Sequence, residues 1–531
     1  MSDPWWRGAV IYQIYIRSFA DGNGDGYGDF AGVISKLGYI SGLGVDAIWL
    51  SPIHPSPDRD WGYDVSDYEG IHPHYGTQKD FDDLVAAAHE RGLKVLTDEV
   101  LAHTSDEHPW FVDSLKRGDK ADWYVWADPK MDGTAPNNWL SAFGGPAWAY
   151  QPARRQYYHH KFLRQQPKLN WHNADARAAV LAVLDHWLAR GVDGFRLDVA
   201  TAYIHDATLT DNPAVPMDAR TGFNWAHAPN LQFHYHDSNM PEDLEALDEI
   251  RRTVEHYPDR FVMGEFSEEA EHCGCYAAPD KGLHSGYSFP LLEARKLAPG
   301  FVRDYYDVLA RYPDFWPSIA FSNHDVMRTV SRFGGKEPPE GLAKLMLALL
   351  FALRGTVLLY QGEELGLPQA KVTREQIRDP VGDLYYPYTY GRDGCRTPMP
   401  WDLGAKNFGF TDGTPWLPVS DTHGPLTVSH QATDPNSTLT FARAFLVARR
   451  ENAALRLGDI EFLDAPEPVL AFTRTHGEES ILCLFNMSGE EAAFGDARLV
   501  AGASLNIGCG TVRVDQKGVV LGPYAAEFVR F

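Results

Sequence analysis

Short runs of β-prone residues alternate with amphipathic helical stretches along most of the 531-residue chain, and this alternation limits the fold more than any other feature. Eight strands are predicted, at residues 9–16, 45–50, 94–100, 194–199, 260–266, 285–290, 318–323 and 356–361. Helical periodicity follows several of them, at 29–43, 78–91 and 176–190. Eight such βα units predict an α/β fold in which parallel strands close into a (β/α)8 barrel.

Two segments depart from the alternation. Residues 104–171 are rich in Trp, Pro, Gly and Asn and too long for a structureless loop, so we expect an inserted small domain after the third strand. Residues 456–531 contain short alternating runs that predict a C-terminal antiparallel, β-sandwich-like domain. The barrel would then comprise 1–103 and 172–455. An open doubly wound sheet is the alternative, but no Gly-x-Gly-x-x-Gly follows the first strand.

Charge and cysteine usage restrict the partners and the compartment. A net charge of −24 disfavours nucleic acid and anionic membranes, and it favours a neutral substrate over a phosphorylated one. The N-terminus does not resemble a signal peptide, and the longest apolar run, 345–353, is too short to span a membrane. Five scattered cysteines suggest reduced thiols. We therefore expect a cytoplasmic monomer or homodimer with no nucleic-acid or membrane partner.

Polar side chains stand at the ends of several predicted strands, where the active sites of such barrels lie. They occur in Tyr63–Asp64, Asp98–His103, Gly194–Asp198, Met263–Glu265 and Asn323–Asp325. A single carboxylate at a strand end is usually a helix cap or a salt-bridge partner, whereas this whole set favours a common site.

Two of these carboxylates are predicted to have different roles. Arg196 and Asp198 are two residues apart on a strand and so share a face, where the guanidinium is expected to keep Asp198 ionised, as a nucleophile requires. Glu265 follows an apolar run, a setting that raises a carboxyl pKa and suits a general acid. Such a division of roles is what glycoside hydrolysis needs.

The strand-end segments 98–103, 194–198, 263–265 and 323–325 resemble, in order, the four signature regions of the α-amylase family of glycoside hydrolases. Residues 5–15 resemble the family's opening strand. The segments 143–148, 166–170 and 391–401 are similar to its α-glucosidase and oligo-1,6-glucosidase branch. The resemblance implies an exo-acting, retaining enzyme that removes terminal α-linked glucose, of the maltose, isomaltose or sucrose type, through a covalent glucosyl-enzyme intermediate.

The resemblance also implies roles for individual residues. Asp198 would be the nucleophile, Glu265 the acid/base, and Asp325 the carboxylate that binds sugar hydroxyls and helps distort the ring. The two reacting carboxyls of a retaining enzyme lie about 5–5.5 Å apart. The glucosyl unit would be held and its pocket lined by Tyr63, Asp64, His103, Phe143, Phe162, Arg196, Val199, His324 and Arg392.

Three positions depart from the family pattern or vary within it. Ala102 replaces the Asn that helps bind calcium in true amylases, so that calcium site is expected to be absent. Lys168 replaces the Asp of the usual Gln-Pro-Asp-Leu-Asn. Val199, next to the predicted nucleophile, is the residue type that accompanies α-1,6 preference among relatives, where Thr accompanies α-1,4 preference.

A separate Gly-rich segment, Asp21–Asp29, alternates oxygen-bearing side chains in the manner of calcium loops. It is not an EF-hand, because Gly32 stands at the twelfth position. A polar turn is the alternative. Relatives carry Ca²⁺ or Mg²⁺ in this loop, so we expect a structural cation with ligands among Asp21, Asn23, Asp25, Tyr27 and Asp29.

Other functions remain open. An α-glucosyltransferase or a sucrose isomerase would share the covalent intermediate and differ only in the access of water and sugar acceptors. A trehalose-6-phosphate hydrolase is less compatible with the acidic chain. A catalytically silent subunit of an amino-acid transporter shares the barrel but carries a membrane anchor. The longest apolar run of this chain is too short for such an anchor, and the chain contains all three carboxylates, so this alternative is disfavoured.

Overall fold

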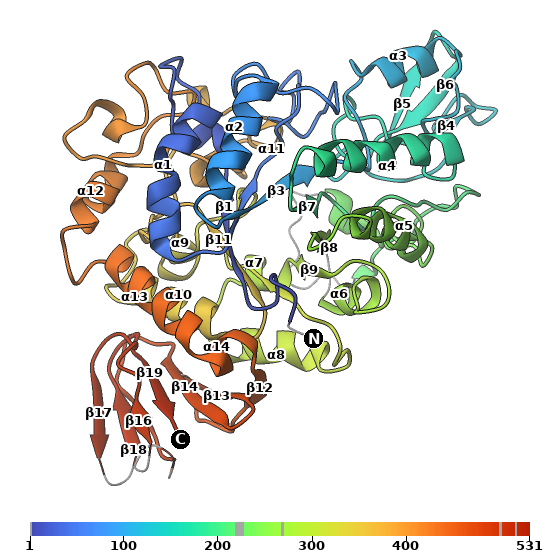
Figure 1. The fold of residues 1–531 in the computed structure, drawn as a ribbon. Coiled ribbons are helices and arrows are strands. Elements are labelled where there is room, and N and C mark those ends of the chain that lie inside the picture. Colours follow the sequence, from blue (N-terminus) through green and yellow to red (C-terminus); the bar gives the residue numbers. More distant parts are fainter. Residues whose placement is uncertain (1–2, 218–227, 267–269, 497, 499–501, 516–517) are drawn as a thin grey trace.

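The chain forms a parallel (β/α)8 barrel in a computed structural model that describes residues 3–217, 228–266, 270–496, 498, 502–515 and 518–531 (Figure 1). The eight predicted strands are confirmed. In the order of the sheet they are β10 (Ser318–Ile319), β11 (Thr356–Tyr360), β1 (Val10–Ile14), β2 (Ala47–Leu50), β3 (Lys94–Glu99), β7 (Gly194–Leu197), β8 (Phe261–Phe266) and β9 (Ser285–Ser288). All neighbours in this order pair in parallel.

The barrel is nearly closed rather than fully closed by backbone pairing. The first and last strands of the sheet, β10 and β9, are linked by side chains: the hydroxyls of Ser285 and Ser318 lie 2.8 Å apart, and Ser285 donates to the carbonyl of Trp316 at 2.7 Å. The predicted strand at 318–323 is paired only at its first two residues.

Helices surround the sheet and follow the strands along the chain. They are α1 (Phe30–Leu43), α2 (Gln78–His89), α4 (Ala174–Ala189), α5 (Asp243–Glu255), α6 (Ala270–Tyr276), α7 (Pro290–Glu293), α8 (Pro299–Leu309), α9 (Thr329–Gly334), α10 (Leu342–Ala352), α11 (Pro380–Tyr385), α12 (Val428–Gln431), α13 (Thr438–Glu451) and α14 (Ala453–Leu457). Side-chain caps define the N-termini of several helices: Thr77 and Asp80 form a capping box before α2, and Asn173 caps α4. Within the described residues, none of these helices has the length and apolarity needed to cross a membrane.

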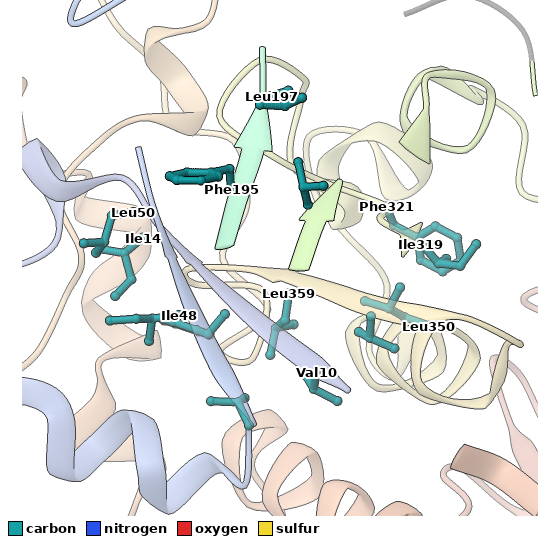
Figure 2. Close-up of a cluster of buried hydrophobic side chains, with 14 of the residues drawn as sticks. Val10, Ile14, Ile48, Leu50, Phe195, Leu197, Ile319, Phe321, Leu350 and Leu359 are labelled. Carbon is teal, nitrogen blue, oxygen red and sulfur yellow. The ribbon is translucent and has the colours of Figure 1, made fainter. Parts of the chain in front are cut away.

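Alternation along the strands divides the core into two layers. Val10, Ile14, Ile48 and Leu50 belong to the layer between the sheet and the helices, together with Leu350 of α10 (Figure 2). The intervening residues point into the barrel. Its lower interior is filled by apolar side chains that include Ile11, Trp49, Leu96, Met263 and Leu358. Polar side chains replace the apolar ones near the carboxyl ends of the strands, and an active site can form there.

The two additional β regions are also present. The insert after β3 contains α3 (Pro109–Leu115) and an antiparallel sheet of β4 (Trp126–Ala127), β6 (Gln156–His159) and β5 (Trp148–Gln151). The C-terminal region has one sheet in the order β12 (Asp459–Phe462), β13 (Val469–His476), β14 (Glu479–Asn486), β19 (Ala526–Arg530) and β16 (Ala503–Ser504). A second sheet joins β15 (Ala492–Phe494), β18 (Gly518–Leu521) and β17 (Val512–Asp515). Figure 1 places the two regions at opposite ends of the barrel.

Candidate active site

A pocket of about 350 Å³ lies at the carboxyl ends of the barrel strands. Its lining comes from the strand ends, the insert and the segment after β11. The residues are Asp60, Tyr63, His103, Ala142, Phe143, Phe162, Gln166, Asp198, Val199, Glu265, Phe289, Glu293, Asp325, Val381 and Arg392. Most of the predicted site residues are thus brought together in one cavity.

Arg196 is buried outside the pocket lining, where it contacts two of the lining carboxyls. One guanidinium nitrogen, Nη1, donates to Asp98 at 2.7 Å and to Asp198 at 2.9 Å, while Nη2 lies 2.6 Å from Oε1 of Glu265. The hydroxyl of Tyr287 accepts from Nε of Arg196 at 3.1 Å and donates to Glu265 at 3.2 Å. A single guanidinium therefore bridges the predicted nucleophile and the predicted acid/base.

Burial controls the protonation of this cluster. It raises the pKa of Glu265, as predicted, and that of Asp98 to about 7. Burial also raises the pKa of Asp198 well above its ordinary value, although Arg196 opposes the shift. The charge of Arg196 thus acts on Asp198 in the predicted direction, but burial is the larger effect. Sequence could not show that three carboxyls share one guanidinium and raise one another's pKa values.

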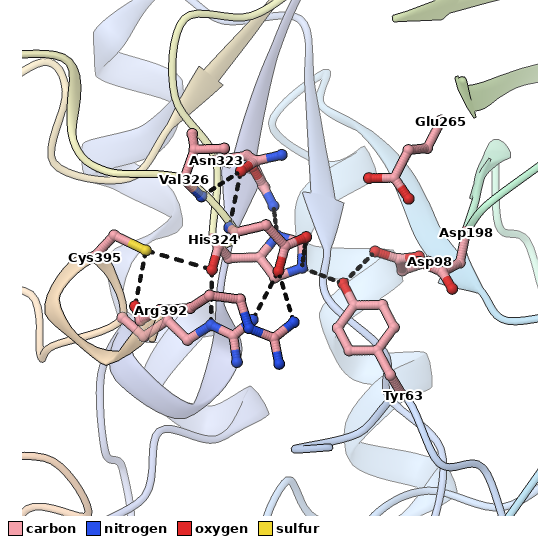
Figure 3. A network of polar contacts seen from close by, with 12 residues as sticks. Tyr63, Asp98, Asp198, Glu265, Asn323, His324, Val326, Arg392 and Cys395 are labelled. Carbon is pink, nitrogen blue, oxygen red and sulfur yellow. Dashed lines mark hydrogen bonds and ion pairs between the residues drawn. The ribbon is translucent and has the colours of Figure 1, made fainter. Parts of the chain in front are cut away.

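A chain of hydrogen bonds connects β1 to β3 and includes Tyr63 of the pocket lining (Figure 3). The side-chain amide of Gln13 donates to Nδ1 of His324 at 2.8 Å, which leaves the proton of that ring on Nε2, facing the hydroxyl of Tyr63. Tyr63 in turn donates to Oδ2 of Asp98 at 3.1 Å. Burial lowers the pKa of His324 to about 3, so the ring is a neutral hydrogen-bonding group near pH 7.

Asp325 faces two guanidinium groups and the ring of His324. Its Oδ1 accepts from Arg392 at 3.0 Å and from Arg396 at 2.8 Å, and Oδ2 lies 3.3 Å from His324. Burial opposes ionisation of Asp325, but these neighbours outweigh it and hold its pKa below the ordinary range. Asp325 is therefore an anion, available to accept hydrogen bonds from sugar hydroxyls.

Asp60, and not the predicted Asp64, belongs to the pocket lining. Asp60 lines the pocket and accepts from Arg392 at 2.6 Å and from Gln166 at 3.2 Å. Asp64 is buried outside the lining, where its carboxylate accepts from the hydroxyl of Ser56 and from two backbone N–H groups of its own loop. The assignment of Asp64 to sugar contact is thus not supported by its position.

Aromatic and apolar groups form the walls. Phe143 and Phe162 of the insert pack edge to face at 5.6 Å, and the guanidinium of Arg392 lies 5.3 Å from the ring of Phe143. Gln166, Phe289, Glu293 and Val381 also line the pocket, although they were not predicted to do so. The last three follow β9 or β11, and the course of those loops decides whether they reach the pocket.

Val199 has a strained backbone. Its φ of 44° is rare for a β-branched side chain, and such strain is found mainly at functional sites. The strained turn directs the N–H of Val199 to Oε2 of Glu265, at 3.2 Å. The residue after the predicted nucleophile thus also contacts the predicted acid/base.

Comparison with known proteins agrees with this geometry. The family described as "Alpha amylase, catalytic domain" matches residues 13–458. The chain belongs to the α-amylase family. It is 49% identical over 500 residues to a probable α-glucosidase of Rhizobium meliloti (strain 1021), a match that covers 92% of this chain and 90% of the relative. An oligo-1,6-glucosidase of Parageobacillus thermoglucosidasius is 35% identical over 531 residues, covering 93% and 92%.

Among solved structures, an α-glucosyl transfer enzyme, XgtA, matches over 100% of both chains with a TM-score of 0.96 and 47% identity. Taken with the carboxylates of the pocket, these relatives identify the chain as an α-glucosidase-type glycoside hydrolase of the α-amylase family.

The loop predicted to bind a cation lies away from the pocket lining. Asp21, Asn23 and Asp25 each accept a hydrogen bond from a backbone N–H two residues ahead, and Asp29 caps α1 by accepting from Gly32 at 2.6 Å. Within the described residues, no three His, Cys, Asp or Glu side chains are grouped as a metal site. The donor set of carboxylate and amide oxygens still fits a hard cation.

Proposed function

We propose that this member of the α-amylase family is a retaining, exo-acting α-glucosidase that removes terminal α-linked glucose from short oligosaccharides or α-glucosides. The observation that carries the proposal is the arrangement around Arg196, whose guanidinium contacts both Asp198 and Glu265 of the pocket lining. Asp325, held by Arg392 and Arg396, supplies an anion for the sugar hydroxyls.

The proposed reaction has two displacements. Asp198 attacks the anomeric carbon while Glu265 gives its proton to the glycosidic oxygen, so the bond to the aglycone breaks and a glucosyl ester forms. Glu265, now a carboxylate, takes a proton from water, and that oxygen displaces Asp198 to release α-glucose. A proton on Glu265 also removes one of the like charges that raise the pKa of Asp198, which favours the nucleophilic anion.

The charge of the pocket supports a neutral substrate. Five carboxyl side chains line it, from Asp60, Asp198, Glu265, Glu293 and Asp325. Arg392 is the cation in that lining, and burial lowers the pKa of His103 to about 4, which leaves the ring uncharged near pH 7. A phosphorylated sugar would be repelled, so we do not favour hydrolysis of trehalose-6-phosphate.

Transfer of glucose to a second sugar is a candidate alongside hydrolysis. The likeness to an α-glucosyl transfer enzyme supports it, as do the rings of Phe143, Phe162 and Phe289, which can stack on an acceptor sugar and limit the access of water. The enzyme should be incubated with maltose, isomaltose, nigerose, sucrose and trehalose while glucose and new oligosaccharides are both measured. Glucose without new oligosaccharides would exclude transfer.

Rescue by azide tests the carboxylate roles. Glu265→Ala should still be glucosylated by a nitrophenyl α-glucoside, whose leaving group needs little protonation, and azide should then release α-glucosyl azide after two inversions. Asp198→Ala should give β-glucosyl azide by a single inversion, if it is rescued. Exchange of the two products would reverse the assignments, and full activity in both variants would place the site elsewhere.

We also propose a structural Ca²⁺ or Mg²⁺ in the first β-α loop, held by oxygens among Asp21, Asn23, Asp25, Tyr27 and Asp29. The loop's carboxylate and amide oxygens suit such ions. When bound, the ion would stabilise the loop and would take no part in the reaction, because these residues do not line the pocket.

A further inference from the structure

Lys168, the residue that departs from the family's usual Asp, is buried with 1% of its surface exposed. Its main chain belongs to the insert: its N–H donates to His159 at 2.9 Å, and its carbonyl accepts from Val125 at 3.2 Å. The next residue, Leu169, donates to the carbonyl of Ala102 beyond the end of β3 at 3.0 Å. The backbone of Lys168 is therefore fixed between the insert and the barrel.

The side chain of Lys168 reaches the loop that carries Asp198. Its ammonium donates to the carbonyl of Tyr203 at 2.9 Å and closely contacts the carbonyl of Ala202. On the other side of the same peptide groups, the carboxyl of Asp243 accepts from the N–H of Ile204 at 2.8 Å and from that of Tyr203. Two consecutive peptide groups are thus held between a buried cation and a buried carboxyl.

Each of these charges depends on the other. Burial lowers the pKa of Lys168 to about 7, and the attraction of Asp243 opposes that shift. Burial likewise raises the pKa of Asp243 to about 7, against the attraction of Lys168 and hydrogen bonds from the backbone. A neutral substitute for Lys168 would leave both carbonyls without these donors and would leave Asp243 without a countercharge.

The held segment is coupled to the reacting carboxyls through a short loop. The N–H of Ala202 donates to the carbonyl of Val199 at 3.0 Å, and that of Ala200 donates to the carbonyl of Glu265, also at 3.0 Å. Val199 is the strained residue whose own N–H contacts the side chain of Glu265. Strain of this kind persists only where the surroundings enforce it, and the contacts of Lys168 restrain the end of this loop.

We propose that Lys168 is a positioning residue that holds the loop carrying Asp198 in its reactive geometry through the carbonyl groups of Ala202 and Tyr203. The inference rests on the proposed role of Asp198 as nucleophile. Lys168 does not line the pocket, so its removal should affect the reacting geometry more than the binding of glucose.

The test compares Lys168→Met with a matched control, Lys161→Met. Lys161 is the other buried lysine that joins the insert to the segment after β7, but its ammonium contacts the side chains of Asp237 at 2.9 Å and Ser238 at 2.5 Å instead of the nucleophile loop. Lys168→Met should lower kcat on a nitrophenyl α-glucoside by about 10- to 100-fold, the cost of a displacement of about 1 Å, with KM changed less than about threefold. Lys161→Met should lower the melting temperature and leave kcat within about twofold of wild type.

Equal loss of kcat in the two variants, or a normal kcat in Lys168→Met, would overturn the inference. If Lys168→Met does not fold, Lys168→Met with Asp243→Asn removes both charges. This pair should fold with the same low kcat, and a wild-type kcat in it would overturn the inference as well. Asp198→Ala is the reference variant. If Asp198→Ala remains active, the proposed nucleophile itself is refuted. If Asp198→Ala is inactive while Lys168→Met has a normal kcat, only the role of Lys168 is refuted.

Discussion

Replacing Tyr287 by Phe should move the alkaline limit of activity to higher pH. The hydroxyl of Tyr287 donates to Oε1 of Glu265 at 3.2 Å and lowers the pKa of that carboxyl. A hydrogen bond to a charged group contributes about 1.5–3 kcal/mol, and this one is long for two oxygens, so the lower value applies. Since one pKa unit corresponds to about 1.36 kcal/mol, Tyr287→Phe should raise the pKa of Glu265 by about one unit.

The sign of the shift follows from the proposed role of Glu265. A general acid must be protonated, so a higher pKa extends activity toward alkaline pH. The assay is kcat/KM across pH on the disaccharide that the enzyme hydrolyses best, because a poor leaving group requires the proton. Tyr63→Phe is the control, since the hydroxyl of Tyr63 contacts Asp98 and His324 but not Glu265. An unmoved or lowered alkaline limit in folded Tyr287→Phe would refute the reasoning.

Three further outcomes are expected. Asp60→Asn should raise KM by about 10- to 100-fold, because it weakens the contact with Arg392. Asp64→Asn should instead lower the melting temperature and leave KM within about threefold of wild type. Michaelis kinetics and thermal melts of the two variants test this difference. Val199→Thr should shift the ratio of isomaltose to maltose hydrolysis toward maltose by about two- to tenfold, and an unchanged ratio would remove Val199 from the specificity argument. Chelation of the ion proposed at residues 21–29 should lower the melting temperature by a few degrees while leaving turnover at 25 °C nearly intact; immediate loss of turnover with an unchanged melting curve would make the ion catalytic.

The sequence was most informative where one periodicity governs position. Arg196, Asp198 and Glu265 could be placed on the barrel rim because strand period and barrel geometry together determine where strand ends meet. Asp60 and Asp64 could not be separated in this way. They flank a turn in which Trp61 and Gly62 have φ values of 51° and 108°, and such a turn decides which carboxylate enters the pocket.

Properties that depend on neighbours distant in sequence were also beyond prediction. The raised pKa of Asp198 reflects its burial and then the charges of Glu265, Asp98 and Asp325, which lie far from Asp198 along the chain. Lys168 could be recognised as a departure from the family, but its partners are the carbonyls of Ala202 and Tyr203, 34 and 35 residues further along the chain.

The origin of the pocket wall has a consequence for how such an enzyme can diversify. Asp198 and Asp325 follow barrel strands and Glu265 lies near the end of β8, whereas Phe143 and Phe162 come from an insert that leaves the barrel after β3 and returns before α4. Changes within that insert can reshape the space for an incoming hydroxyl without moving the carboxyls. Evolution or laboratory recombination can therefore vary the choice between water and sugar as acceptor by exchanging one contiguous segment, provided that the contacts of Lys168 with the barrel are kept.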